Sequence, residues 1–126
     1  MEEINKEFVT YEQALALKEL GFYELCFTWY WDDIGMYNGV VYANHNKNPN
    51  YVSAPLKQQV FRWFRDKCKL HSTITSISQE SWQWHITKPS ECLGKLYEED
   101  FYNYEEAEDA CINTLIEIVK NESKKD

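Results

Sequence analysis

Apolar residues recur at helical spacing in three stretches of the chain. In residues 11–20 they share one face, with a capping-box pattern at Thr10 and Gln13 before it and the stop signal Gly21 after it. Residues 103–120 combine a second capping-box pattern with a longer apolar stripe. Both stretches are therefore predicted to be amphipathic helices.

The third helical stretch lies in the middle of the chain. Apolar residues recur every four positions from Leu56 to Cys68, with Trp63 beside them and polar residues on the opposite face. Ser53 is the expected N-cap, and Pro55 is tolerated in a first helical turn. The pattern predicts a helix that packs Trp63 into the core.

Four segments without a helical stripe are expected to be strands: residues 25–31, 40–43, 71–78 and 81–87. The first two and the last two are each expected to form a hairpin. In the last segment Trp82 and Trp84 alternate with polar residues, so both tryptophans should lie on one face. Residues 91–101 fit either a loop or a short strand.

The expected order of elements is therefore α-β-β-α-β-β-α. Hairpins give antiparallel strands, and one-sided helices need an apolar sheet face to cover. The sequence predicts an α+β fold with helices packed on one face of an antiparallel sheet of about four strands. Its 126 residues suit a single domain, 1–126, with frayed ends at residues 1–8 and 121–126.

Charge and composition narrow the classes of function. With 13 Lys and Arg against 21 Asp and Glu, the net charge is −8, which argues against binding to nucleic acid or to an anionic membrane. No apolar stretch is long enough for a membrane span, and the acidic first residues do not resemble a signal peptide. Four scattered cysteines are expected to be free thiols. A cytoplasmic protein is predicted.

Catalytic motifs are weak. Cys68 and His71 lie three residues apart, but Cys68 belongs to the apolar stripe and no third group is in place to orient the pair. The histidines do not have metal-ligand spacing, and no phosphate-binding glycine motif occurs. We therefore expect no catalytic residue, no metal site and no cofactor, with an unrecognised hydrolase as the least favoured alternative.

Residues 45–90 carry most of the basic side chains. Arg62 and Arg65, with Lys69 and His71 nearby, form either a solvated face or an anion-binding patch. Together with the aromatic side chains of Trp82 and Trp84, the two arginines would suit a flat anionic ligand such as a nucleotide.

Residues 98–109 contain seven acids and no base. Acids near a helix N-terminus complement the helix dipole, which accounts for part of this strip. With its tyrosines, the strip also suits a basic partner protein. The protein-binding residues predicted on this basis are Glu98, Glu99, Asp100, Phe101, Tyr102 and Tyr104.

Aromatic residues make up 16% of the chain, which is more than a small core needs. We expect Trp63 and one face of each hairpin to be buried. The remaining rings would leave an exposed aromatic sheet face, which could hold a flat ligand, stack bases or pair two subunits as a homodimer.

Three segments give the chain a resemblance to known proteins: residues 14–22 (ALALKELGF), 54–65 (APLKQQVFRWFR) and 104–111 (YEEAEDAC). There it resembles a recurrent group of short bacteriophage and prophage proteins, especially of Bacteroidetes, that have no assigned activity. The resemblance covers most of the chain, although its motifs are capping and packing patterns. It implies an accessory phage-type protein in the host cytoplasm.

Two functional hypotheses result from the sequence. The first is a non-enzymatic protein-binding module whose acidic, tyrosine-bearing surface engages a host or phage protein. The second is a binding protein for a nucleotide-like ligand that uses the aromatic sheet face with Arg62 and Arg65.

Overall fold

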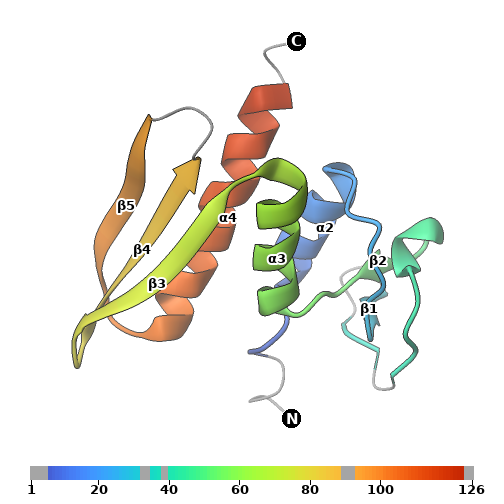
Figure 1. Cartoon of the computed structure of the whole chain (residues 1–126). Coiled ribbons are helices and arrows are strands. Elements are labelled where there is room, and N and C mark those ends of the chain that lie inside the picture. Colours follow the sequence, from blue (N-terminus) through green and yellow to red (C-terminus); the bar gives the residue numbers. More distant parts are fainter. Residues whose placement is uncertain (1–5, 32–34, 38–39, 89–92, 124–126) are drawn as a thin grey trace. The chain divides into compact units, whose positions relative to one another are not determined.

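The computed structural model describes residues 6–31, 35–37, 40–88 and 93–123, with the backbone alone for residues 93–100 and 123. In these ranges the chain forms three α-helices, five β-strands and one short 3-10 helix (Figure 1). The predicted α+β class is confirmed. The chain divides into two compact units, residues 1–59 and 60–126, and the predicted single domain stays a prediction.

Helix α2 (Tyr11–Glu19) opens the first unit and has the predicted caps. Thr10 and Gln13 form both bonds of the capping box, at 2.9 and 3.1 Å. Gly21 adopts the left-handed conformation with φ +94°, and the next residue, Phe22, is fully buried. Both ends of α2 are therefore determined by local sequence.

The sheet of the first unit is short. Strand β1 (Trp29–Tyr30) pairs antiparallel with β2 (Val52–Ser53), a strand that the sequence did not indicate. The predicted hairpin between residues 25–31 and 40–43 is present as an irregular ladder, in which Cys26 and Ala43 exchange backbone bonds of 2.9 and 3.1 Å.

Ser53 does not cap the middle helix, so that prediction is wrong. Its backbone belongs to β2, and helix α3 (Lys57–Cys68) begins four residues later. The stripe of α3 is confirmed, because Val60 and Phe64 are fully buried and Trp63 is 8% exposed. Lys69 follows in left-handed backbone with φ +59°.

The second unit contains a three-stranded antiparallel sheet with the order β3-β4-β5. Its strands are β3 (His71–Ser78), β4 (Ser81–Lys88) and β5 (Leu93–Phe101). The predicted hairpin between β3 and β4 is confirmed, and the segment left open by the sequence is a strand. The prediction of a single sheet of about four strands is wrong, because β1 pairs with β2 and not with the second hairpin.

Helix α4 (Tyr104–Ser123) packs on all three strands of this sheet (Figure 1). Its buried face is rotated from the predicted stripe, because Ile112 and Ile116 are buried, whereas Thr114, Ile118 and Val119 of that stripe are only half-buried. Two segments expected to fray are ordered in part. The helix continues to Ser123, and Phe8 pairs with Leu56.

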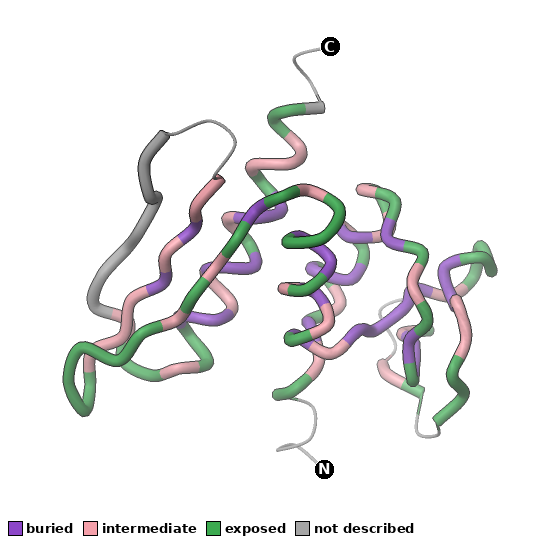
Figure 2. Tube along the Cα trace, viewed as in Figure 1, coloured by how far each residue is buried: buried purple, intermediate pink, exposed green. Residues whose placement is uncertain are grey.

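Each unit has its own set of buried apolar side chains (Figure 2). In the first unit they are Val9, Ala14, Leu17, Phe22, Cys26, Trp29, Val52 and Ala54. In the second they are Val60, Trp63, Phe64, Leu70, Trp84, Ile86, Ala107, Cys111, Ile112, Leu115 and Ile116.

Candidate protein-interaction surface

Burial alternates along the chain after α2. Cys26 and Thr28 are buried, whereas Tyr23, Leu25 and Phe27 expose 54, 48 and 42% of their surface. Adjacent side chains of an extended segment face opposite sides, so one side of this segment faces the core and the other faces solvent. Here the side that faces solvent is the more apolar one.

Hydrogen bonds explain why Thr28, a polar side chain, is buried in this segment while its apolar neighbours are exposed. Thr28 Oγ1 donates to the carbonyl of Tyr37 at 3.0 Å, so burying its hydroxyl leaves no polar group unpaired. Phe22 N–H donates to the carbonyl of Leu17 at 3.0 Å, in the Schellman arrangement that ends α2. These contacts fix which residues point inward, and they leave Tyr23, Leu25 and Phe27 outside.

Residues 40–42 add three more exposed apolar side chains, and Tyr42 contacts Phe27. Tyr42 is 59% exposed, and its ring lies 5.1 Å from the ring of Phe27. Val40 and Val41 are 74 and 47% exposed. We define the outer face as these six residues: Tyr23, Leu25, Phe27, Val40, Val41 and Tyr42.

A buried histidine holds the two segments of the outer face together. His45 Nε2 lies 3.2 Å from the carbonyl of Cys26 and 2.6 Å from that of Val41. Because carbonyls only accept hydrogen bonds, this nitrogen carries the hydrogen. The imidazole packs against Trp29 at 4.4 Å, and Trp29 stacks on Tyr37 at 4.1 Å. The scaffold beneath the outer face is therefore well supported.

A buried amide supports the same scaffold from another direction. Asn46 Nδ2 donates to the carbonyl of Phe22 at 2.6 Å, and Asn46 Oδ1 accepts from the N–H of Ser53 at 2.8 Å. The side chain thus links the start of the exposed segment to β2. A buried polar group with both partners in place restricts the conformations that its neighbours can adopt.

The area of the outer face can be compared with the largest apolar patch of a typical monomeric protein. A fully exposed aromatic side chain presents about 200 Å², so the six partly exposed residues together present on the order of 500 Å². The largest apolar patch on a monomeric protein is typically about 300–600 Å² and is often functional. None of the six side chains carries a charge.

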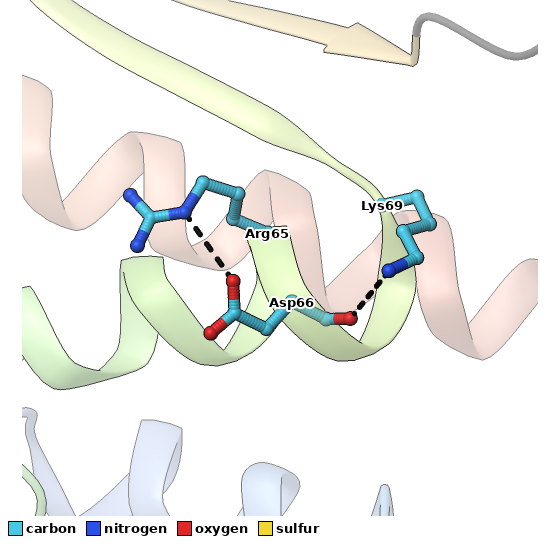
Figure 3. A network of polar contacts seen from close by, with 3 residues as sticks. All are labelled: Arg65, Asp66 and Lys69. Carbon is cyan, nitrogen blue, oxygen red and sulfur yellow. Dashed lines mark hydrogen bonds and ion pairs between the residues drawn. The ribbon is translucent and has the colours of Figure 1, made fainter.

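The predicted anion-binding arginines lie on the exposed side of α3. Arg65 Nε is 3.5 Å from Asp66 Oδ1, and Lys69 Nζ donates to the carbonyl of Asp66 at 3.0 Å (Figure 3). An anionic ligand at Arg65 would compete with this carboxylate. His71 is exposed at the start of β3, and the anion-binding role of Arg62 and Arg65 stays a prediction.

Trp82 and Trp84 lie on the same face of β4, as predicted, because the register with β3 is regular between them. The ring of Trp82 is in edge contact with the ring of Tyr104 on α4, at 5.4 Å, and Trp84 is 4% exposed. A flat ligand stacked on Trp84 would have to displace its neighbours. The described contacts of both tryptophans are packing contacts.

The structure describes the side chains of only part of the acidic strip, residues 98–109. Residues 98–100 lie in β5, and the predictions for their side chains fall outside the described residues. Phe101 is half-buried opposite Trp82, and Tyr104 packs on the same indole. Tyr102 is 64% exposed, so it is the aromatic residue of this strip that can anchor a partner.

The start of α4 accounts for some of the acids. Asn103 Oδ1 accepts from the N–H of Glu106 at 2.9 Å, which confirms the cap, and Glu106 Oε2 accepts from the N–H of Tyr102 at 3.3 Å. Glu105 and Glu106 are exposed, whereas Glu108 is buried. The exposed part of the strip is therefore shorter than the run of acids in the sequence.

Burial keeps the three described thiols, those of Cys26, Cys68 and Cys111, protonated. Burial raises the pKa of Cys26 and of Cys111 to about 12. The pKa of Cys68 is also raised, first by burial and then by the charge of Glu122. All three are free thiols, as predicted, while Cys92 lies outside the described residues. A thiol that holds its proton is a poor nucleophile.

Within the part of the chain that the structure describes, no three His, Cys, Asp or Glu side chains cluster so as to hold a metal ion. No helix there combines the length and apolar character needed to cross a bilayer. No family model, curated protein or solved structure matches the chain. The interpretation of the outer face therefore depends on its own residues.

The sequence predicts an exposed aromatic face, but the ligand-binding residues that it indicates are Trp82 and Trp84. A usable signal was present at the end of α2. A Schellman motif directs the second residue after the cap, here Phe22, onto the helix. Counting alternate positions from Phe22 then places Tyr23, Leu25 and Phe27 on the solvent side.

Proposed function

We propose that this chain is a protein-binding module that docks another polypeptide on its outer face. The observation that carries the proposal is the group of six uncharged, exposed apolar side chains on a scaffold held by His45 and Asn46. At roughly 25 cal/mol per Å², covering on the order of 500 Å² yields about 12 kcal/mol before the cost of association. A complementary apolar surface on the partner would make binding favourable.

The chemistry of the outer face favours a polypeptide over a nucleic acid. Exposed rings can stack on bases, but affinity for nucleic acid comes largely from Lys and Arg at the phosphates. The six residues include no cation, and the net charge of the chain is −8. Aromatic side chains are enriched at protein interfaces, where they cover large areas at low entropic cost.

Tyr102 supports a second contact region for a basic partner. Its exposed ring lies next to the exposed residues Glu105 and Glu106, in line with the prediction of an acidic, tyrosine-bearing surface. The proposed partner is a host or phage protein in the cytoplasm, as the resemblance to phage accessory proteins implies.

A photo-crosslinking amino acid tests the outer face directly. Placed at position 27, p-benzoylphenylalanine should form a covalent adduct with a protein when cells that express the variant are irradiated. The matched control carries the same residue in place of Ile77, an exposed apolar side chain on β3. Adduct at position 27 and not at position 77 supports the proposal, whereas no adduct above background at position 27 contradicts it.

A further inference from the structure

Four aromatic rings around strand β1 form a cluster that includes no residue of the outer face. Tyr37 and Tyr51 stack on Trp29, with ring centroids 4.1 and 5.0 Å away, and Trp31 makes an edge contact with Tyr51 at 6.3 Å. Trp29 is buried, whereas Trp31 and Tyr37 expose 56 and 43% of their surface. We define these four residues as the aromatic cluster. Its accessible rings are preformed, because they pack on a buried ring directly or through Tyr51.

Backbone pairing leaves open space beside Trp31. The N–H of Trp31 donates to the carbonyl of Gly35 at 3.0 Å, and the N–H of Tyr37 donates to that of Trp29 at 2.9 Å. Trp31 thus lies opposite Gly35, and opposite side chains of an antiparallel pair share a face. A Cβ at Gly35 would meet nothing within 4 Å outside its chain neighbours. An apolar group of a ligand can therefore contact the indole on this side.

The polar atoms of the aromatic cluster are hydrogen-bond donors. The indole N–H of Trp31 and the phenol O–H groups of Tyr37 and Tyr51 form no hydrogen bond with the residues that the structure describes. The buried indole N–H of Trp29 also lacks a partner in those ranges. The cluster includes no carboxylate and no amide side chain. A complementary ligand therefore supplies apolar groups and hydrogen-bond acceptors.

We propose that the aromatic cluster binds a proline-rich segment of another protein in the polyproline II conformation. A proline residue supplies an apolar ring and a carbonyl acceptor but has no N–H, so it leaves no donor unsatisfied in this site. Such a segment already populates polyproline II before it binds, so ordering it costs little entropy, and aromatic rings suit its surface. The inference goes beyond the proposed function, since it assigns a second site with its own ligand.

Other ligands fit the aromatic cluster less well. A cation would meet the negative faces of the rings, but Lys18 Nζ donates to the carbonyl of Tyr51 at 2.7 Å and so places a positive charge at the site. The hydroxyl groups of a sugar and the N–H groups of an ordinary peptide are donors, for which the cluster has no carboxylate or amide acceptor. A proline-rich segment avoids both difficulties.

NMR spectroscopy of the nitrogen-15-labelled full chain tests the proposal. Each of the five tryptophans gives one indole N–H signal, and that of Trp31 is the one lost in Trp31→Phe. Decaproline at up to millimolar concentration should shift this signal saturably, and a Gly-Ser peptide of equal length should not. Measured from backbone amide signals, Trp31→Ala should weaken decaproline binding at least about tenfold. The control Ile77→Ala, at an exposed apolar position of the second unit, should bind as wild type does.

The outcomes separate this inference from the proposed function. A Trp31 signal that decaproline does not move, or equal affinity of Trp31→Ala and wild type, overturns the proline-binding site. A saturable shift with choline or with maltohexaose, and none with decaproline, also overturns it and assigns a cation or a carbohydrate. Melting temperature shows that each variant is folded. Trp31→Ala leaves the outer face unchanged, so an adduct at position 27 that persists in this variant keeps the proposed function whatever decaproline does.

Discussion

Replacing Lys69 with glycine should make the protein more stable. Lys69 follows α3 with φ +59°, a left-handed conformation that costs an L-residue roughly 1–2 kcal/mol. Glycine adopts this conformation freely, but it adds roughly 0.5–1 kcal/mol of conformational freedom to the unfolded chain. The difference predicts that Lys69→Gly raises the free energy of unfolding by about 0.5–1 kcal/mol.

The lost side chain reduces this gain only slightly. Lys69 Nζ donates to the carbonyl of Asp66 at 3.0 Å, but both residues are exposed (Figure 3). Water replaces an exposed hydrogen bond at little cost, since its net contribution is small. A gain of 0.5–1 kcal/mol would raise the melting temperature by about 2–5 °C in a chain of this length.

Urea unfolding measured by tryptophan fluorescence is a suitable assay, because Trp63, Trp82 and Trp84 all lie in the second unit. Lys67→Gly is the matched control, since Lys67 is exposed in the last turn of α3. In a helical conformation glycine should cost about 1 kcal/mol. The two lysine variants should thus change stability in opposite directions. A Lys69→Gly protein as destabilised as Lys67→Gly would refute the reasoning.

Trp63→Ala should lose about 3–5 kcal/mol of unfolding free energy because the indole is 8% exposed, and a loss below about 1 kcal/mol would show that it does not pack inward. Burial raises the pKa of Cys26 and Cys111 to about 12, so the contribution of these two thiols to stability should be constant below the unfolded value of 9.0 and fall from there toward pH 12. Thermal scans should show a shallower fall for Cys111→Ala than for wild type, and equal slopes would contradict this. Replacing the carboxylates of residues 98–100 with amides should keep or raise the melting temperature and weaken capture of a partner. Loss of stability without loss of binding would contradict the predicted role of the acidic strip.

The helices could be predicted from sequence because their signals are local. Thr10, Gln13 and Gly21 lie within a dozen residues of one another and determine both ends of α2. The division into two sheets depends on contacts between distant residues. Nothing near Ser53 indicates that it pairs with Trp29, 24 residues earlier, and a serine two residues before a proline resembles a helix cap equally well.

The candidate surface was only partly predictable for a similar reason. The sequence showed an excess of aromatic residues, but both sides of the segment from Phe22 to Trp31 contain apolar residues, so alternation distinguishes the sides only when it is counted from Phe22, and it ends at the buried Trp29. The distinction depends on polar contacts such as those of His45 and Asn46 with backbone groups far along the chain. The sequence could predict that Trp82 and Trp84 share a face of their strand. It could not predict that α4 packs against that face.

The anchoring of Phe22 and Cys26 means that the outer face is encoded by spacing more than by residue identity. Both anchors are fully buried, and between them lie three residues. Inserting or deleting one residue there would exchange the two sides of the segment and bury side chains that now face solvent. Substitutions at positions 23, 25 and 27, by contrast, leave both anchors in place. Different side chains at these three positions would therefore change the chemistry of the outer face while the fold stays the same.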